Sequence, residues 1–355
     1  MSDTAQRTPA VAGGGPGGPA ARNGGLDRLR AAGIFLLKQR EVTVFAVAVL
    51  LTVYFGFINS IGRATFFTKL DMINLTQYWG PIVVLALGEV LLLICGEIDL
   101  SVGWIYAFAP FLMYFLIVDY HLPGILAIII TLAFGAFVGW VNGFLTVTLG
   151  LPSFIATLGT GFILAGLILT TDSGEQVTIP NQVVGIGHWI GTYAWAEITW
   201  AVILCLAAHI LLRRTRWGLH TIAVGGNALG AAEAGVKVGR IKYGNFMITG
   251  TLGAFVGLQI AFQSSIGDTF SGGSGFQSMF YAVAAAVIGG TAMLGGSGTM
   301  IGAFFGAYVI AILEDGFAVV GVSAYPLQIF YGAAILLAMI LNVQFARLRA
   351  RGRIL

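Results

Sequence analysis

Residues 81–103 read PIVVLALGEVLLLICGEIDLSVG, and this stretch decides the fold class. Its first fourteen residues carry a single charge, Glu89, which is typical of a membrane-spanning helix rather than a helix of a soluble protein. The acids Glu97 and Asp99 interrupt the apolar run before a second one starts at Leu100. The stretch therefore predicts two membrane spans joined by a short polar connection.

Similar apolar runs follow one another along most of the 355 residues. The chain is 57% hydrophobic and only 9% charged, with a mean hydropathy of +0.91. Soluble domains are ~45–50% apolar and ~25% charged. This composition excludes an ordinary cytosolic enzyme and a nucleic-acid-binding protein, and predicts an all-α polytopic membrane protein.

The apolar runs predict about ten transmembrane helices within a membrane domain that covers residues 41–345. An even number of spans returns the C-terminus to the side of the N-terminus. The expected spans are residues 42–58, 77–95, 100–119, 123–149, 153–171, 198–212, 244–262, 279–294, 301–321 and 325–345.

The basic residues indicate the orientation. Sixteen of the 18 Lys and Arg residues lie in residues 1–40, 213–243 and 346–355, and such residues mark cytoplasmic segments. Both termini are therefore expected to be cytoplasmic, the first as a Gly- and Pro-rich disordered tail and the last as a basic tail. Residues 213–243 are expected to form a cytoplasmic loop with room for one or two short helices. Residues 172–197 are expected to form a periplasmic loop.

The cysteines and histidines predict no metal site. Cys95 and Cys205 are solitary thiols in apolar runs, and the four histidines are not at ligand spacing. Small residues instead recur four apart, which favours close contacts between helices. These stripes are Gly135, Gly139 and Gly143; Gly253 and Gly257; and Gly298, Gly302 and Gly306.

Polar residues inside the apolar regions are candidates for a solute path. An acid within a span, such as Glu89, is a functional-site hypothesis by default, although Asp99 or Ser101 could equally cap the next helix. Uncharged polar groups near residues 142–157 suit a neutral hydroxylated solute, but they could also serve ordinary helix contacts. The path candidates are Glu89, Glu97, Asp99, Ser101, Asn142, Phe154 and Thr157.

The basic loop holds a candidate docking element. Gly225-Gly226-Asn227 is a turn signal, residues 228–234 favour a short helix, and Gly235 can end it. A helix of small residues flanked by basic ones is suited to dock into a cleft of another protein. The chain has no GxxxxGK[ST] motif, so any nucleotide chemistry must come from a partner.

Five stretches resemble one family in its own order, over about residues 75–341. They are GEIDLSVG at 96–103, NGFLTVTLGLPSFIATLGT at 142–160, RTRWGLHTIAVGGN at 214–227, AGVKV at 234–238 and VIGGTAMLGGSGTMIGAFFGA at 287–307. The chain resembles the permease subunit of bacterial ABC importers for simple sugars of the ribose, xylose and galactose type.

The resemblance implies a multi-pass permease of the bacterial inner membrane that is not itself an enzyme and binds no cofactor. Its implied partners are a cytoplasmic ATPase that holds ATP and Mg, a periplasmic sugar-binding protein, and a second permease copy or paralogue. Residues 213–243 become the coupling element. There Gly225, Gly226, Asn227, Ala231 and Gly235 match the family's coupling pattern, whereas the acid Glu233 stands later than in the family.

Three other functions stay open at this point. An ion-coupled secondary transporter would use Glu89, Asp99, Glu314 and Asp315 as proton or sodium sites. An integral membrane enzyme is disfavoured because the chain has no clustered His, Cys or nucleophile–base motif. Export by the same kind of machinery would need no periplasmic binding protein.

Overall fold

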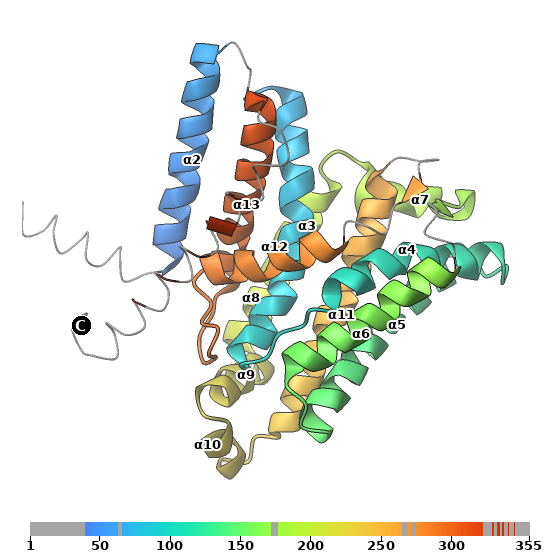
Figure 1. Cartoon of the computed structure of the whole chain (residues 1–355), viewed down its shortest axis with the longest axis vertical. Helices are drawn as coiled ribbons and strands as arrows, with labels where there is room; N and C mark the ends of the chain where they lie inside the picture. Colours follow the sequence, from blue (N-terminus) through green and yellow to red (C-terminus); the bar gives the residue numbers. More distant parts are fainter. Residues whose placement is uncertain are drawn as a thin grey trace, which may run out of the picture. The chain divides into compact units, whose positions relative to one another are not determined.

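The computed structural model describes residues 40–62, 66–171, 177–264, 269–270 and 275–321, with the isolated positions 329, 332, 333, 336, 340 and 344 (Figure 1). The predicted disordered tail and the basic tail at 346–355 lie outside the described residues, apart from Arg40. All but six positions of the tenth expected span also lie outside them, so that span stays a prediction.

Each of the first nine expected spans has a helix. Six helices are long and apolar enough to cross a membrane: α3, α5 with the π-helix η1 that continues it, α6, α8, α11 and α13. The others, α2, α4 and α12, contain shorter apolar segments. The bounds are α2 Arg40–Gly62, α3 Lys69–Ile94, α4 Val102–Val118, α5 Gly124–Gly143, η1 Phe144–Thr148, α6 Ser153–Thr171, α8 Ala196–Arg214, α11 Val238–Gln263, α12 Gly275–Ile288 and α13 Met300–Val320. The chain is thus a multi-pass helical membrane protein.

Helix α3 begins eight residues before the expected span because of its cap. The Thr68 hydroxyl accepts a hydrogen bond from the Asp71 amide at 3.2 Å, and the Asp71 carboxylate accepts one from the Thr68 amide at 3.3 Å. This capping box satisfies free amides at the helix start. Helix α12 ends six residues early, where Gly290 has a left-handed backbone with φ of +87°.

Loops expected on the same side of the membrane contact one another. The two-residue strands β1 (Val177–Thr178) and β2 (Thr269–Phe270) pair antiparallel and come from two segments that the span count places outside. The outer segment continues as η2 (Asn181–Val183), α7 (Val184–Gly187) and η3 (His188–Thr192). The contacts are consistent with the expected alternation of the chain.

The expected cytoplasmic loop contains two short helices, α9 (Arg216–Gly226) and α10 (Ala228–Glu233). Both follow α8, and Figure 1 shows them at one end of the long helices, at the bottom of the view. Helix α9 packs against α8, α11 and the end of α3. The prediction of short helices in this loop is confirmed.

Helix α3 is the central element of the described part. It packs against α8, α11, α12 and α13, and every residue from Gly80 to Ile94 is buried. Figure 1 shows α12 running across α3 rather than along it. By contrast, α5 and α6 expose large apolar side chains such as Phe137, Phe162 and Ile163, as lipid-facing helices do.

The predicted small-residue stripes lie at helix contacts, except that Gly298 precedes α13 and contacts the Ile94 side chain from a loop. A Cβ added at Gly139 would stand 2.2 Å from the Phe246 carbonyl oxygen of α11, and one at Gly135 would stand 2.3 Å from that of Gly250. Gly257 approaches α4 in the same way, and Gly306 approaches α12. These glycines let the backbones come closer than any larger residue allows.

Replacing Gly139 with alanine should therefore destabilise the contact between α5 and α11. A clash with backbone atoms cannot be relieved by a side-chain rotation, and such overpacking costs about 1–3 kcal/mol. Gly159→Ala in α6 is the matched control, because an added Cβ meets nothing within 4 Å there. Thermal unfolding in detergent should show a lower midpoint for Gly139→Ala only, and equal midpoints would contradict the close contact.

Candidate functional site

The site is built around residues 95–101, the α3–α4 loop, which starts where α3 ends. Gly96 takes a left-handed backbone with φ of +75°. The Gly96 amide donates to the Leu93 carbonyl at 2.9 Å, and the Glu97 amide donates to the Leu92 carbonyl at 3.0 Å. This pattern of two bonds around a glycine ends the helix and turns the chain back toward α4.

Asp99 is the acceptor at the centre of the loop. It is fully buried, and its Oδ1 accepts from the Ser101 amide at 2.8 Å and from the Ser101 hydroxyl at 2.6 Å. It also accepts from the Val102 amide. Asp99 thus caps the start of α4, whereas the Ser101 side chain makes no cap bond to the helix.

Two further helices contribute to the same polar network. The Asn142 side-chain amide of α5 donates to Asp99 at 3.3 Å and to the Ser101 hydroxyl at 2.8 Å. The Thr160 hydroxyl of α6 donates to the Asn142 side-chain oxygen at 2.7 Å. The Thr157 hydroxyl accepts from the Leu100 amide at 3.0 Å. One network therefore joins α4, α5 and α6.

The acids of this network are held without a cation. Burial raises the pKa of Asp99 above its ordinary value, and the hydrogen bonds from Ser101, Asn142 and Val102 oppose that shift. Glu89 is also fully buried, with Oε2 3.5 Å from the Asp99 amide and Oε1 without a hydrogen-bond partner in the described structure. The described residues hold no ion pair to either acid.

The predicted path residues fall into two groups. Glu89, Asp99, Ser101, Asn142 and Thr157 come together and are all fully buried. The Phe154 side chain is 53% exposed, and Glu97 is turned toward α11 instead. Because no member of the network is exposed, the site is closed to solutes in this conformation.

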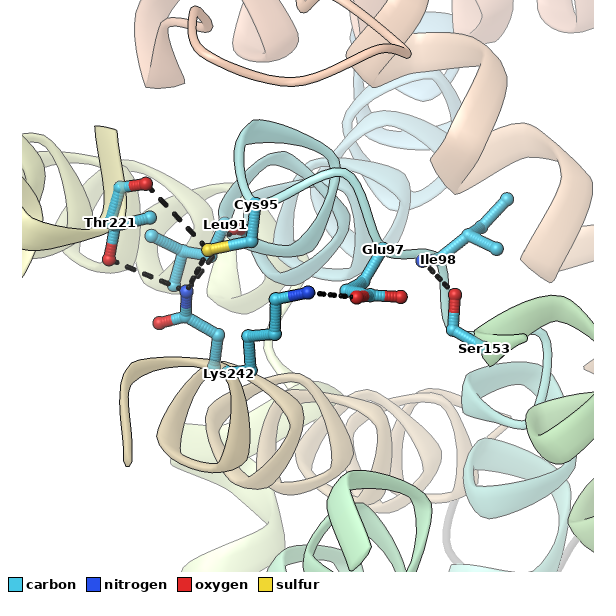
Figure 2. Close-up of polar contacts among 8 residues, drawn as sticks. Leu91, Cys95, Glu97, Ile98, Ser153, Thr221 and Lys242 are labelled. Atoms are coloured by element: carbon cyan, nitrogen blue, oxygen red, sulfur yellow. Dashed lines mark hydrogen bonds and ion pairs between the residues drawn. The ribbon is translucent and has the colours of Figure 1, made fainter. Parts of the chain in front are cut away.

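Glu97 forms an ion pair with Lys242 at the start of α11 (Figure 2). Figure 2 shows the two side chains reaching toward each other below the α3–α4 loop. Sequence reasoning missed Lys242 as a site residue. It also missed Thr160 and Asn245, a residue of α11 that bonds to Leu91 and Cys95 at the end of α3. The pair is separated by 145 residues, so no local spacing could have revealed it.

The predicted coupling residues lie in α9, in α10 and in the turns that flank α10. Asn227 caps α10, with its Oδ1 accepting from the Gly230 amide at 2.9 Å. Gly235 follows α10 with φ of +85°. Glu233 is exposed, whereas Ala231 is buried against Val224 and Ile241. Ala231 thus packs against α9 and α11 of its own chain.

Gly225 and Gly226 lie in the last turn of α9 rather than in a loop. A Cβ at Gly225 would stand 1.5 Å from the Ile94 carbonyl oxygen at the end of α3. The Gly296 amide, from the loop between α12 and α13, donates to that same carbonyl at 2.8 Å. The end of α9 is therefore in direct contact with the start of the α3–α4 loop.

The remaining acids singled out from the sequence lie elsewhere. Glu314 and Asp315 are in α13, where Asp315 is buried and its Oδ2 has no hydrogen-bond partner in the described structure. They are not part of the Asp99 network. The described residues include no group of three His, Cys, Asp or Glu side chains that could hold a metal ion.

Removal of the Asn142 amide should destabilise the network. In Asn142→Ala, Asp99 and the Thr160 hydroxyl each lose a buried partner, which costs about 1–3 kcal/mol. Thr170→Val is the control, because the exposed Thr170 hydroxyl bonds only to carbonyls of its own helix. Thermal unfolding of the two purified variants compares them, and an unchanged midpoint for Asn142→Ala would argue against the network.

Comparison with known proteins identifies the family. Residues 71–340 match the family described as branched-chain amino acid transport system / permease component. The xylose/arabinose import permease protein XylH of Sulfolobus acidocaldarius is 33% identical over 86% of both chains. The ribose import permease protein RbsC of Escherichia coli K12 is 30% identical, over 78% of this chain and 87% of that one.

The autoinducer 2 import system permease protein LsrC of Escherichia coli O9:H4 is 30% identical, over 87% of this chain and 88% of that one. No solved structure matches the chain. The family match covers most of the membrane helices and both the α3–α4 loop and the loop with α9 and α10. The chain belongs to the family of branched-chain amino acid transport system permease components, and it is a transport subunit rather than an enzyme.

Proposed function

We propose that the chain forms the translocation path of an ATP-driven, binding-protein-dependent importer of a simple sugar or a related polyol. Its relatives are named as import permeases for xylose and arabinose, for ribose and for autoinducer 2. The observation that carries the proposal is the buried cluster of hydroxyl, amide and carboxyl groups around Asp99. A solute rich in hydroxyl groups needs hydrogen-bonding groups of this kind.

The closed state of the cluster supports alternating access. Asp99, Ser101, Asn142 and Thr157 satisfy one another and are shielded from solvent. A passing solute would have to replace some of these bonds after the helices separate. Partners that bind the open state more tightly can shift that equilibrium, since a ligand acts only through its differential affinity for the two states.

Residues 213–243 are proposed as the coupling segment that docks on a separate ATPase. The six-residue helix α10 exposes Leu229, which is 72% exposed, beside exposed Ala228 and Ala232. Such an apolar tip on the cytoplasmic side is suited to a cleft in a partner protein. Its connection to the path runs through α9, whose Gly225 contacts the end of α3.

The remaining parts of the importer are proposed as separate proteins. A cytoplasmic ABC ATPase supplies ATP and Mg²⁺, and a periplasmic sugar-binding protein delivers the solute to the outer side. A second permease copy or paralogue completes the path in the bacterial inner membrane. The lack of a phosphate-binding motif in this chain supports an ATPase on another chain.

Asn227→Ala should uncouple ATP hydrolysis from transport while the protein still inserts. Loss of the cap costs α10 about 1 kcal/mol of helix stability. The proposed docking helix is then formed in a smaller fraction of the molecules. Proteoliposomes with the ATPase and the binding protein should show uptake lowered about fivefold or more, the scale of a typical coupling free energy. Asn227→Ser, which keeps a capping oxygen, is the matched control and should retain most of the uptake.

Two outcomes would contradict the proposal. Uptake by Asn227→Ala at the wild-type rate would show that α10 is not the coupling element. Purification of the wild-type chain without any ATPase, together with uptake that follows an ion gradient and ignores ATP, would favour the ion-coupled carrier instead.

A further inference from the structure

The α3–α4 loop is held by groups from three other helices within its first four residues. The Cys95 thiol lies 3.7 Å from the Thr221 carbonyl of α9, Glu97 pairs with Lys242 of α11, and the Ile98 amide donates to the Ser153 hydroxyl of α6 at 3.3 Å. Figure 2 shows the Cys95 sulfur directed toward Thr221 and the Glu97 carboxylate directed toward Lys242. These contacts fix the backbone just before Asp99.

Asn245 connects two of these helices to α3. This fully buried side chain of α11 donates to the Leu91 carbonyl at 3.3 Å and to the Cys95 sulfur at 3.2 Å. Its oxygen accepts from the Trp217 indole of α9 at 2.9 Å. The first turns of α11, the helix α9 and the end of α3 therefore form one polar junction.

The ion pair is the charged contact of this junction. The Glu97 side chain is 11% exposed and that of Lys242 is 21% exposed, whereas Lys237 and Arg240 in the same segment are exposed. Removal of one partner would leave the other charge poorly solvated and unpaired. Such an uncompensated charge destabilises the folded state. Removal of one partner is therefore more costly here than in an ordinary surface ion pair.

Its place in the chain gives the pair a mechanical consequence. Lys242 lies nine residues after the end of α10, within the coupling segment, and Glu97 lies two residues before Asp99. A displacement of the coupling segment that carries Lys242 with it must move Glu97 or break the pair. In either case the contacts that hold the backbone next to Asp99 change.

We propose that Glu97 and Lys242 are positioning residues whose ion pair transmits the movement of the coupling segment to the Asp99 network. The inference rests on the proposed function, since it assigns a transmission element to the same site. It adds a charged contact, between residues 145 positions apart, to the path and coupling residues.

The test uses the complex of permease, ATPase and binding protein in proteoliposomes. The main measured quantity is the stimulation ratio, that is, the ATPase activity with the solute-loaded binding protein divided by the basal activity. Uptake per ATP hydrolysed is measured in the same samples. Glu97→Gln, Lys242→Gln and the double neutral variant should each lower this ratio about fivefold or more. The double variant should be no worse than either single one, since the three changes remove the same interaction.

The exchanged pair, Glu97→Lys with Lys242→Glu, should restore most of the ratio. Lys69→Gln is the control, because it removes an exposed positive charge at the opposite end of α3. The double neutral variant leaves no unpaired charge, so it reports on coupling even where a single variant folds poorly. A merely structural role would lower the amount of folded complex without changing the ratio per complex.

The inference is overturned if the double neutral variant keeps the wild-type ratio, or if the exchanged pair restores nothing. Its failure is distinct from failure of the proposed function. If the ATPase co-purifies with the permease and Asn227→Ala uncouples transport, but the ion-pair variants do not, only the transmission role is wrong. If the wild-type chain binds no ATPase, both are wrong.

Discussion

Helix α3 ends inside the protein, and the polar groups exposed at that end must be satisfied there by protein partners. Water would normally cover the last carbonyls of a helix, but α3 is buried from Gly80 to Ile94. The Ile94 carbonyl accepts from the Gly296 amide, and the Leu91 carbonyl accepts from Asn245. Helix α11 and the loop before α13 supply these partners, and α9 packs against the Ile94 carbonyl at Gly225.

Glycine is what makes the contact possible. Gly225 approaches the Ile94 carbonyl so closely that no side chain could be accommodated, and Gly295 and Gly296 adopt left-handed backbones beside it. The Gly-rich stretch at residues 289–299 thus serves backbone packing at the end of α3. Gly225 of α9 has the same role, which explains why a turn signal in the sequence corresponds to the end of a helix.

The sequence predicted what depends on composition and local chemistry. Apolar runs located nine of the helices, four-residue spacing located the glycine contacts, and Asn227 with Gly235 bounded α10. Hydropathy could not reveal the capping box at Thr68 or the π-helix after α5, because polar caps and wide turns leave the mean hydropathy almost unchanged. The pairing of Glu97 with Lys242, and of Asn142 with Asp99, depends on how the helices pack. No local pattern encodes it.

The Asp99 network also explains what holds α4, α5 and α6 together in the closed arrangement. Its members satisfy one another, so separation of the helices costs several buried hydrogen bonds at once unless new partners appear. Hydroxyl groups of the proposed solute would be such partners. Glu89 differs from the others because its Oε1 has no hydrogen-bond partner in the described structure. A movement of the α3–α4 loop would change the surroundings of this acid first, since the Asp99 amide is the contact that its other oxygen makes. A buried acid with one unpaired oxygen thus lies beside the loop that Lys242 and Ser153 restrain.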